Sequence, residues 1–170
     1  MADLFEVAKS RRSTRQFTEE HISDETIKKI LDVAAYMPSS WGGYPMEYIV
    51  IRDKKVMAEL ARCKAMGAGP LAYGDVAIVP IIDKRNRELW VEDAAVASTY
   101  ILLAAENYGV GACWIHMKDR KGHTNMAEDD IRSLLGIPNY YGILNAVSLG
   151  MKAKPSEERN ILPKIHDGKY

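Results

Sequence analysis

The sequence is poor in the residues that build disulfide scaffolds and metal sites. It has 2 cysteines, Cys63 and Cys113, which lie far apart and in no paired motif. The 4 histidines are scattered, with no i, i+4 pair among them. We therefore expect neither a disulfide framework nor a zinc site, and Cys113 is expected to be a core thiol within an apolar strand.

An excess of charge of one sign is also missing. Lys+Arg and Asp+Glu both total 23, so the formal net charge is zero. Proteins that bind duplex nucleic acid usually carry a basic excess, and proteins that bind membrane surfaces a basic stripe. Neither a nucleic acid nor a membrane is expected as a partner.

Long hydrophobic runs are absent as well. The longest apolar stretch, residues 94–105, is broken by Ser98 and Thr99 and falls well short of the ~20 residues that cross a bilayer. The first residues are acidic and lack the apolar core of a signal peptide. A cytoplasmic location is the expectation that follows.

What is present suits one folded domain. Hydrophobic residues make up 47% of the chain and charged residues 27%, which is ordinary for a globular protein. The 170 residues are enough for one compact domain, 1–170, with a sizeable core. The end of the chain, residues 151–170, is charged and interrupted by proline, and reads as a tail with no core of its own.

Hydrophobic periodicity and capping residues predict helices that alternate with strands. Helices are expected at residues 3–9, 24–37, 54–64, 88–108 and 128–135, with Ser23 and Asp53 as N-caps. Strands are expected at 48–51, 76–82, 111–117 and 146–150, and loops at 39–45 and 66–70. Pro80 is an objection to the second strand, because proline cannot donate to a β-ladder. The order indicates an α/β or α+β sandwich with a sheet flanked by helices.

One short segment carries chemistry of its own. Arg11, Arg12 and Arg15 lie close together, with Ser13 and Thr14 between them. The guanidinium group binds phosphate oxygens through two parallel hydrogen bonds, and a hydroxyl adds another. Since side chains alternate in an extended segment, Arg11, Ser13 and Arg15 are expected to face one ligand and Arg12 to face elsewhere. A solvated basic turn between helices is the other reading of such a cluster.

The segment Ser-Arg-Arg-Ser-Thr-Arg-Gln-Phe at residues 10–17 resembles the opening motif of the nitroreductase family, which holds the phosphate, ribityl chain and pyrimidine edge of FMN. Three more segments resemble family motifs, in the family's order. Residues 36–45 resemble the loop beside the flavin, and 93–111 the buried helix with its glycine exit. Ile165 and His166 with the terminal Tyr170 resemble the ending of small members. The resemblance covers nearly the whole chain.

This resemblance implies a fold, a cofactor and an activity. The fold is α+β, a three-layer sandwich with a central mixed or antiparallel sheet flanked by helices, in an intertwined homodimer with FMN at the subunit interface. The small-residue helix at 94–105 suits that interface, and the tail 151–170 would reach the partner subunit. The implied activity is NAD(P)H-driven two-electron reduction of nitroaromatic, quinone or related acceptors through a ping-pong flavin cycle.

The resemblance also assigns site residues. Those for FMN are Arg11, Arg12, Ser13, Arg15, Pro38, Ser39, Ser40, Trp41, Ile115, His116, Met117 and Arg159. For the phosphate, Lys152 and Lys154 compete with Arg159. The substrate pocket would consist of Trp41, Gly42, Gly43 and Tyr44. No residue is assigned as catalytic with certainty, because the flavin carries the chemistry; His116 is expected either to tune the flavin or relay a proton, or to make a structural hydrogen bond.

Two departures from the family pattern keep other functions open. Gly42 and Tyr44 stand where the family usually has Asn and Gln, so the hydrogen bonds of those side chains are absent. A divergent flavin chemistry, such as that of a dehalogenase, is one alternative. A non-catalytic flavin-binding or storage module is another. The physiological substrate and the choice between NADH and NADPH stay open.

Overall fold

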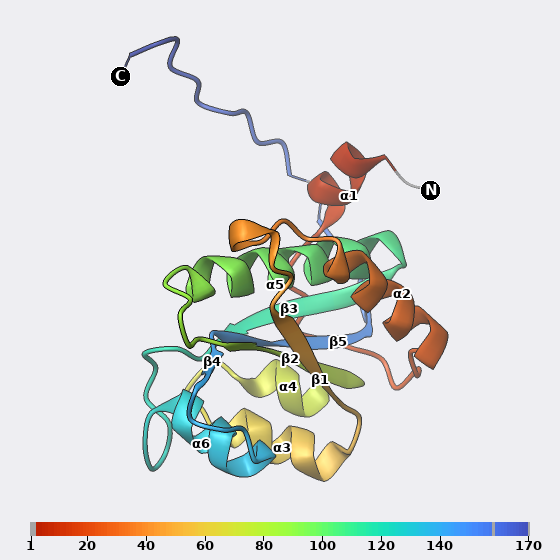
Figure 1. Ribbon diagram of the computed structural model, residues 1–170. Helices are drawn as coiled ribbons and strands as arrows, with labels where there is room; N and C mark the ends of the chain where they lie inside the picture. Colours follow the sequence, from red (N-terminus) through yellow and green to blue (C-terminus); the bar gives the residue numbers. More distant parts are fainter. Residues whose placement is uncertain (1–2, 158, 170) are drawn as a thin grey trace.

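The computed structural model describes residues 3–157 and 159–169, so Tyr170 of the C-terminal motif lies outside the described residues. The helices are α1 (Leu4–Ser10), α2 (Asp24–Ala35), α3 (Lys54–Arg62), α4 (Gly69–Tyr73), α5 (Trp90–Asn107) and α6 (Ala127–Leu135). The strands are β1 (Met46–Ile51), β2 (Val76–Asp83), β3 (Val110–His116), β4 (Tyr141–Ile143) and β5 (Asn145–Met151). A single 3-10 turn, η1 (Ser40–Gly42), precedes β1 (Figure 1).

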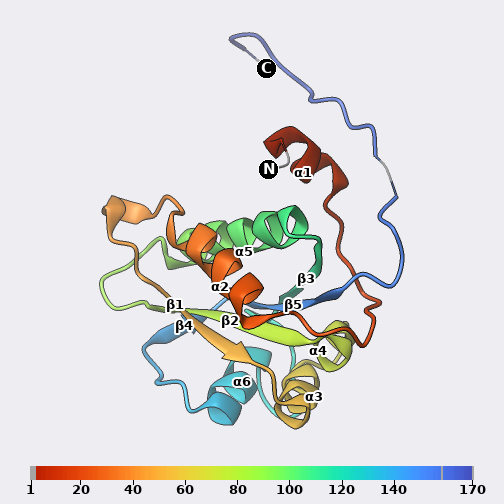
Figure 2. The same cartoon turned by 90° about the vertical axis from the view of Figure 1, so that its right-hand side faces the viewer.

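The elements form three layers around one sheet. The strand order is β1-β2-β5-β3, with β4 also paired to β2, and every pair of these strands is antiparallel. Helices α2 and α5 cover one face of the sheet, and α3, α4 and α6 cover the other (Figures 1 and 2). The predicted three-layer α+β sandwich is confirmed, and its sheet is antiparallel.

The helix boundaries follow from local chemistry. Asp3, Ser23 and Asp53 each accept hydrogen bonds from backbone N–H groups of the first turn, which otherwise have no partner within the helix. At the other end of α5, Gly109 adopts φ 75°, a conformation that costs glycine little and stops the helix. The predicted caps Ser23 and Asp53 are confirmed.

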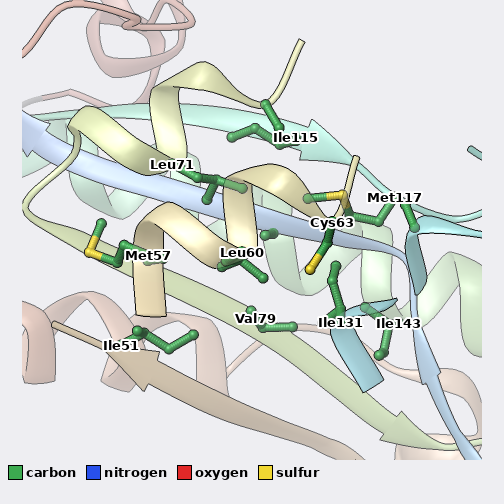
Figure 3. Packing of buried hydrophobic residues seen from close by; sticks show 14 of the residues in the cluster. Ile51, Met57, Leu60, Cys63, Leu71, Val79, Ile115, Met117, Ile131 and Ile143 are labelled. Carbon is green, nitrogen blue, oxygen red and sulfur yellow. The ribbon is translucent and has the colours of Figure 1, made fainter. Parts of the chain in front are cut away.

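Two hydrophobic cores stabilise the sandwich, one on each face of the sheet. The core under α2 and α5 includes Ile30, Ile78, Ile101 and Leu149. The opposite core packs α3, α4 and α6 against the sheet through Leu60, Leu71, Ile131 and their neighbours (Figure 3). Because β2 is buried on both faces, its sequence is continuously apolar instead of alternating.

The structure departs from the predicted elements at two places and accounts for the proline in β2 at a third. The loop predicted at 66–70 is wrong at its end, because Gly69 and Pro70 begin the short helix α4, where a proline costs little in the first turn. Strand β4 was not foreseen, since three residues are too few to show a periodicity. Pro80 does lie in a strand; it falls between the residues of β2 that pair with β5 and those that pair with β4, where the ladder is interrupted.

The two ends of the chain project from the sandwich. Helix α1 buries only Val7, and Leu4 and Phe5 are exposed. The tail leaves the sheet after β5 and runs extended past α1 (Figure 1), with Ile161, Leu162 and Ile165 each at least three-quarters exposed. Large apolar side chains of α1 and the tail are therefore exposed to solvent on one side of the molecule. None of the described helices is long and apolar enough to cross a bilayer.

Candidate functional site

The arginine-rich segment is fixed to the edge of the sheet. Ser13 forms a parallel bridge with Ala112 of β3, and the Thr14 N–H donates to the Ala112 carbonyl oxygen at 2.9 Å. Further along, the Thr18 N–H donates to the Met151 oxygen at 2.9 Å. The segment between α1 and α2 is therefore held as an added strand beside β3 and the end of β5.

Two glycines make this docking possible. Gly111 of β3 and Gly150 of β5 lie opposite each other in the ladder. A Cβ atom at 111 would lie 2.8 Å from Cγ2 of Thr14, and one at 150 would lie 2.6 Å from the Phe17 ring. These distances are too short for real Cβ contacts, so only glycine at these two positions allows the arginine segment to pack against the strands.

A cationic cleft opens beside the segment. Its volume is about 330 Å³. It is lined by Arg12, Ser13, Thr14, Arg15, Gln16, Lys154, Pro155, Ser156, Glu157 and Arg159. Lys152 is not on this cleft: its Nζ contacts both carboxylate oxygens of the half-buried Glu106 at 2.7 Å. Of the three candidates for a phosphate contact, Lys154 and Arg159 are therefore the ones placed near the arginines.

Arg12 carries the clearest sign that the cleft accepts an anion. One of its terminal nitrogens, Nη1, donates to the backbone oxygens of Lys9 and Arg11 at 2.8 and 2.6 Å. Its Nε and Nη2 are buried and have no hydrogen-bond partner among the described residues. Buried donors without partners are costly, by about 1–3 kcal/mol each, and a phosphate group at this place would satisfy them.

The predicted alternation of side chains is not what the structure shows. Arg12 shares the cleft with Ser13 and Arg15, whereas Arg11 lines a neighbouring cleft of about 220 Å³ that also includes Arg12 and Arg159. The reason is that Arg11 is the C-cap of α1, and its N–H donates to the Val7 oxygen. Arg11 therefore belongs to the end of the helix, and the next five residues, 12–16, all line the cationic cleft instead of alternating across it.

The outer edge of β3 continues the site. Ala112 turns its carbonyl oxygen away from β5, toward Thr14. Since backbone groups alternate in an antiparallel ladder, the N–H and C=O groups of Trp114 and His116 point to the same outer edge. Within the described residues, no strand pairs with β3 there. The sequence did not predict a role for Trp114, because only the direction of its backbone groups in the strand places it at this edge.

The three residues assigned to the end of β3 divide between edge and core. Ile115 and Met117 are buried, and their side chains point into the core under α3 and α6 (Figure 3). The Met117 N–H already donates to the Leu144 oxygen at 2.9 Å. Only His116 turns its backbone outward and keeps a half-buried side chain, which stacks with the Trp114 ring at 6.5 Å between ring centroids.

Positive charge surrounds this edge. Burial lowers the pKa of His116, and the charges of Arg120 and Lys64 lower it further, so the imidazole is neutral at pH 7. Burial together with Arg120 also lowers the pKa of Lys64. Burial raises the pKa of the Cys113 thiol on the core face of the strand, which lowers the fraction of nucleophilic thiolate. Lys64 and Arg120 were missed in the sequence, because each lies in a loop with no motif around it.

The second group of predicted residues forms a separate, rigid loop. The N–H and hydroxyl of Ser40 both donate to Oδ1 of the buried Asp93, at 2.8 and 2.9 Å. The Tyr44 N–H donates to the Ser39 hydroxyl oxygen at 2.9 Å. Trp41, Gly42 and Tyr44 have positive φ, which for the two aromatic residues costs about 1–3 kcal/mol each. Pro38, Trp41, Gly42, Gly43 and Tyr44 are exposed, whereas Ser39 and Ser40 are half-buried.

The two groups lie at opposite edges of the sheet. The loop leads directly into β1, one edge strand, whereas the arginine segment lies along β3, the other (Figure 2). No described cleft is lined by residues of both groups. A single chain therefore does not bring the predicted flavin site together.

The fold and the site define a class of protein: an antiparallel α+β sandwich whose edge carries an arginine-rich segment beside a cationic cleft. The sequence profile of the nitroreductase family matches residues 8–69 and 71–151. The chain belongs to the nitroreductase family.

Individual relatives agree with this assignment. A protein of Archaeoglobus fulgidus, provisionally named NADH dehydrogenase/NAD(P)H nitroreductase, is 32% identical over 94% of this chain and 90% of its own length. The structure of an FMN-dependent nitroreductase from Clostridium difficile R20291 superposes with a TM-score of 0.91 at 34% identity, covering 96% of this chain and 98% of that one. A nitroreductase from Desulfovibrio desulfuricans, provisionally so named and described in complex with FMN, has a TM-score of 0.77 at 25% identity and covers 95% and 94%.

Proposed function

We propose that the protein is an FMN-dependent oxidoreductase that uses NAD(P)H to reduce nitroaromatic, quinone or related acceptors in two successive half-reactions. The observation that carries this proposal is the pair of buried, unpartnered nitrogens, Nε and Nη2, of the Arg12 guanidinium beside a cationic cleft. Relatives described as FMN-dependent, or as complexes with FMN, support the cofactor. When bound, FMN supplies a reversible two-electron carrier, so no protein nucleophile is needed.

The cleft fits the phosphate end of this cofactor. Arg12, Arg15, Lys154 and Arg159 contribute four positive charges against the single carboxylate of Glu157. Two nitrogens of the Arg12 guanidinium, Nε and Nη2, have no hydrogen-bond acceptor among the described residues, and the Ser13 hydroxyl lies on the same cleft. Bidentate binding to guanidinium groups both holds a phosphate and sets its orientation.

The outer edge of β3 fits the isoalloxazine ring of FMN. The outward N–H and C=O groups of Trp114 and His116 match the alternating donors and acceptors along a pyrimidine edge. Arg15, Lys64 and Arg120 place positive potential around this strand, and such potential stabilises negative charge that develops on reduction. The neutral imidazole of His116 has one unprotonated ring nitrogen that is able to accept a hydrogen bond or a proton.

We also propose that the site is completed by a second copy of the chain. The loop Ser39–Tyr44 and the arginine segment lie at opposite edges of the sheet, so an edge-to-edge arrangement of two copies would bring one loop to the other copy's arginine segment. Exposed apolar side chains on α1 and the tail support such an interface, among them Phe5 and Leu162.

An absorbance spectrum of the purified protein, with and without added FMN and NAD(P)H, tests the proposal. We expect a yellow protein that binds FMN and is bleached by at least one of the two nucleotides under anaerobic conditions. Arg15→Gln should weaken FMN binding about tenfold or more, since a hydrogen-bonded charge pair is lost. Arg62→Gln, on the far face of the sheet, is the matched control. A colourless protein that binds no added FMN would overturn the proposal.

A further inference from the structure

A third cleft, far from the arginine segment, lies between two loops beside the first turn of α5. Its volume is about 370 Å³, and its lining residues are Ser40, Trp41, Asn86, Arg87, Glu88 and Leu89. One wall comes from the loop that precedes β1, and the other from the connection between β2 and α5. Residues far apart in the sequence therefore meet here around one hollow.

Both walls are held in place by hydrogen bonds. Ser40 is anchored to Asp93 of α5 through its N–H and its hydroxyl. In the opposite wall, the Arg87 N–H donates to the Lys84 oxygen at 3.2 Å, and Asn86 occupies the left-handed region at φ 58°. The cleft is thus formed before any ligand arrives, which lowers the entropic cost of binding.

Trp41 offers an uncovered aromatic face at the cleft. Its side chain is 100% exposed. Its backbone has φ 58°, a conformation that a bulky residue adopts only where the surrounding chain imposes it. An indole held in water by a strained backbone is suited to stacking on a planar ligand.

Arg87 offers a cation with no close carboxylate partner among the described residues, although its charge adds to the effect of Arg85 in lowering the pKa of Asp83. Its guanidinium lies against Gly43, where a Cβ atom would be only 3.3 Å from Nη1, so the absence of a side chain at 43 makes room for it. Among the described residues Arg87 makes no ion pair. The nearby carboxylate of Asp83 is instead taken by Arg85, which contacts both of its oxygens.

We infer that this cleft binds planar aromatic molecules that carry an anionic group, with Arg87 pairing to the anion and Trp41 stacking on the ring. The inference rests on the proposed function for the role of the ligand, which would be the electron acceptor: an aromatic carboxylate or a similar anion. Glu88, on the same cleft, opposes the anion and limits the affinity. NAD(P)H also combines anionic phosphates with aromatic rings, and the kinetic experiment below distinguishes its binding from that of the acceptor.

The binding arm uses calorimetry on the purified protein with 4-nitrobenzoate and its neutral analogue 4-nitrobenzyl alcohol, so it does not depend on turnover. Arg87→Gln is expected to weaken 4-nitrobenzoate binding about tenfold. Trp41→Ala should weaken both compounds, and Glu88→Gln should strengthen the anion alone. Lys84→Gln, on the same loop but outside the lining of the cleft, should leave the preference for the anion unchanged. Equal preference in Arg87→Gln and the unaltered protein would overturn the inference.

The kinetic arm identifies the source of the anion. In the FMN-loaded protein, Arg87→Gln should lower the ratio of kcat/KM for 4-nitrobenzoate over 4-nitrobenzyl alcohol about tenfold, and should leave the rate ratio of flavin reduction by NADPH over NADH as it was. A change only in the nucleotide ratio would overturn the assignment to the acceptor. If no flavin is reduced at all, the proposed function fails, while the calorimetric result still decides the role of Arg87.

Discussion

At the scale of single residues, glycine at two positions decides where the arginine segment lies. Gly111 and Gly150 face each other across β3 and β5 and leave room for Thr14 and Phe17. A side chain at either position would collide with the segment that carries Arg12 and Arg15. The glycines therefore position the residues that we propose bind FMN.

Replacement of Gly111 by alanine tests this role. The added Cβ would lie 2.8 Å from Cγ2 of Thr14, so we expect a loss of about 1–3 kcal/mol in the free energy of unfolding, measured by urea titration. FMN affinity should fall as well, because the arginine segment is displaced.

Two matched variants show whether the collision is the cause. Gly69→Ala places its Cβ 3.7 Å from the Tyr73 ring, an ordinary contact, and should change stability little. Adding Thr14→Ala to Gly111→Ala should restore part of the lost stability. Gly111→Ala as stable as the parent protein would contradict the argument.

At the scale of elements, one buried carboxylate joins three segments at the start of β2. Asp75 is 6% exposed. It lies 2.7 Å from the His21 imidazole and accepts the Ile22 N–H at 2.8 Å, and Arg52 and Lys54 lie at 3.5 and 3.7 Å. The loop before α2, the end of β1 and the start of α3 are thereby tied to β2.

The stability of this junction should depend on pH. Burial raises the pKa of Asp75, but the hydrogen bonds from Ile22 and His21 and the charge of Lys54 outweigh it and hold the pKa below its ordinary 3.8. A carboxyl with a depressed folded-state pKa stabilises the fold above the unfolded pKa, and this stabilisation is lost as the pH falls through the folded pKa.

Asp75→Asn should therefore lower the free energy of unfolding by about 2 kcal/mol at pH 7, and its difference from the parent protein should shrink below pH 3.8. Urea titrations at pH 7, 5 and 3 measure this. Asp24→Asn, which removes an exposed partner of Arg52, is the control and should show little change at any of these pH values. A difference that stays constant down to pH 3 would refute the role of the ionised carboxylate.

At the scale of the whole molecule, the tail contributes little to the fold of its own chain. Ile161, Leu162 and Ile165 are exposed, and no described residue after Lys152 belongs to a helix or strand. In the proposed dimer these side chains would be buried against the second copy. Burying an Ile or Leu side chain is worth about 1.5–3 kcal/mol.

A chain that ends at Asn160 separates the two roles, because it keeps Arg159 at the cationic cleft. We expect its far-UV circular dichroism to match that of the full chain, while its dimer dissociation constant, measured by sedimentation, rises at least about tenfold. Full-length protein with Lys164→Ser serves as the control. An unchanged dissociation constant would show that the tail is not part of the interface.

Much of the secondary structure of this protein is determined by local interactions and could be predicted from its sequence. The caps at Ser23 and Asp53, the apolar β2 and the long α5 follow from hydrogen-bond chemistry and periodicity within a few residues. The arginine segment and its family resemblance predicted the cofactor class, since a phosphate needs clustered donors wherever they are placed.

Only the tertiary structure decided how these parts combine. It set Arg12 beside Arg15 on one cleft, brought Lys64 and Arg120 to the edge of β3 at His116, and placed the Ser39–Tyr44 loop at the opposite edge beside Arg87. Such placements depend on strand order and on packing between distant segments, which leave no periodic trace in the chain. The sequence alone therefore determined which groups are available, and the fold determined which of them meet.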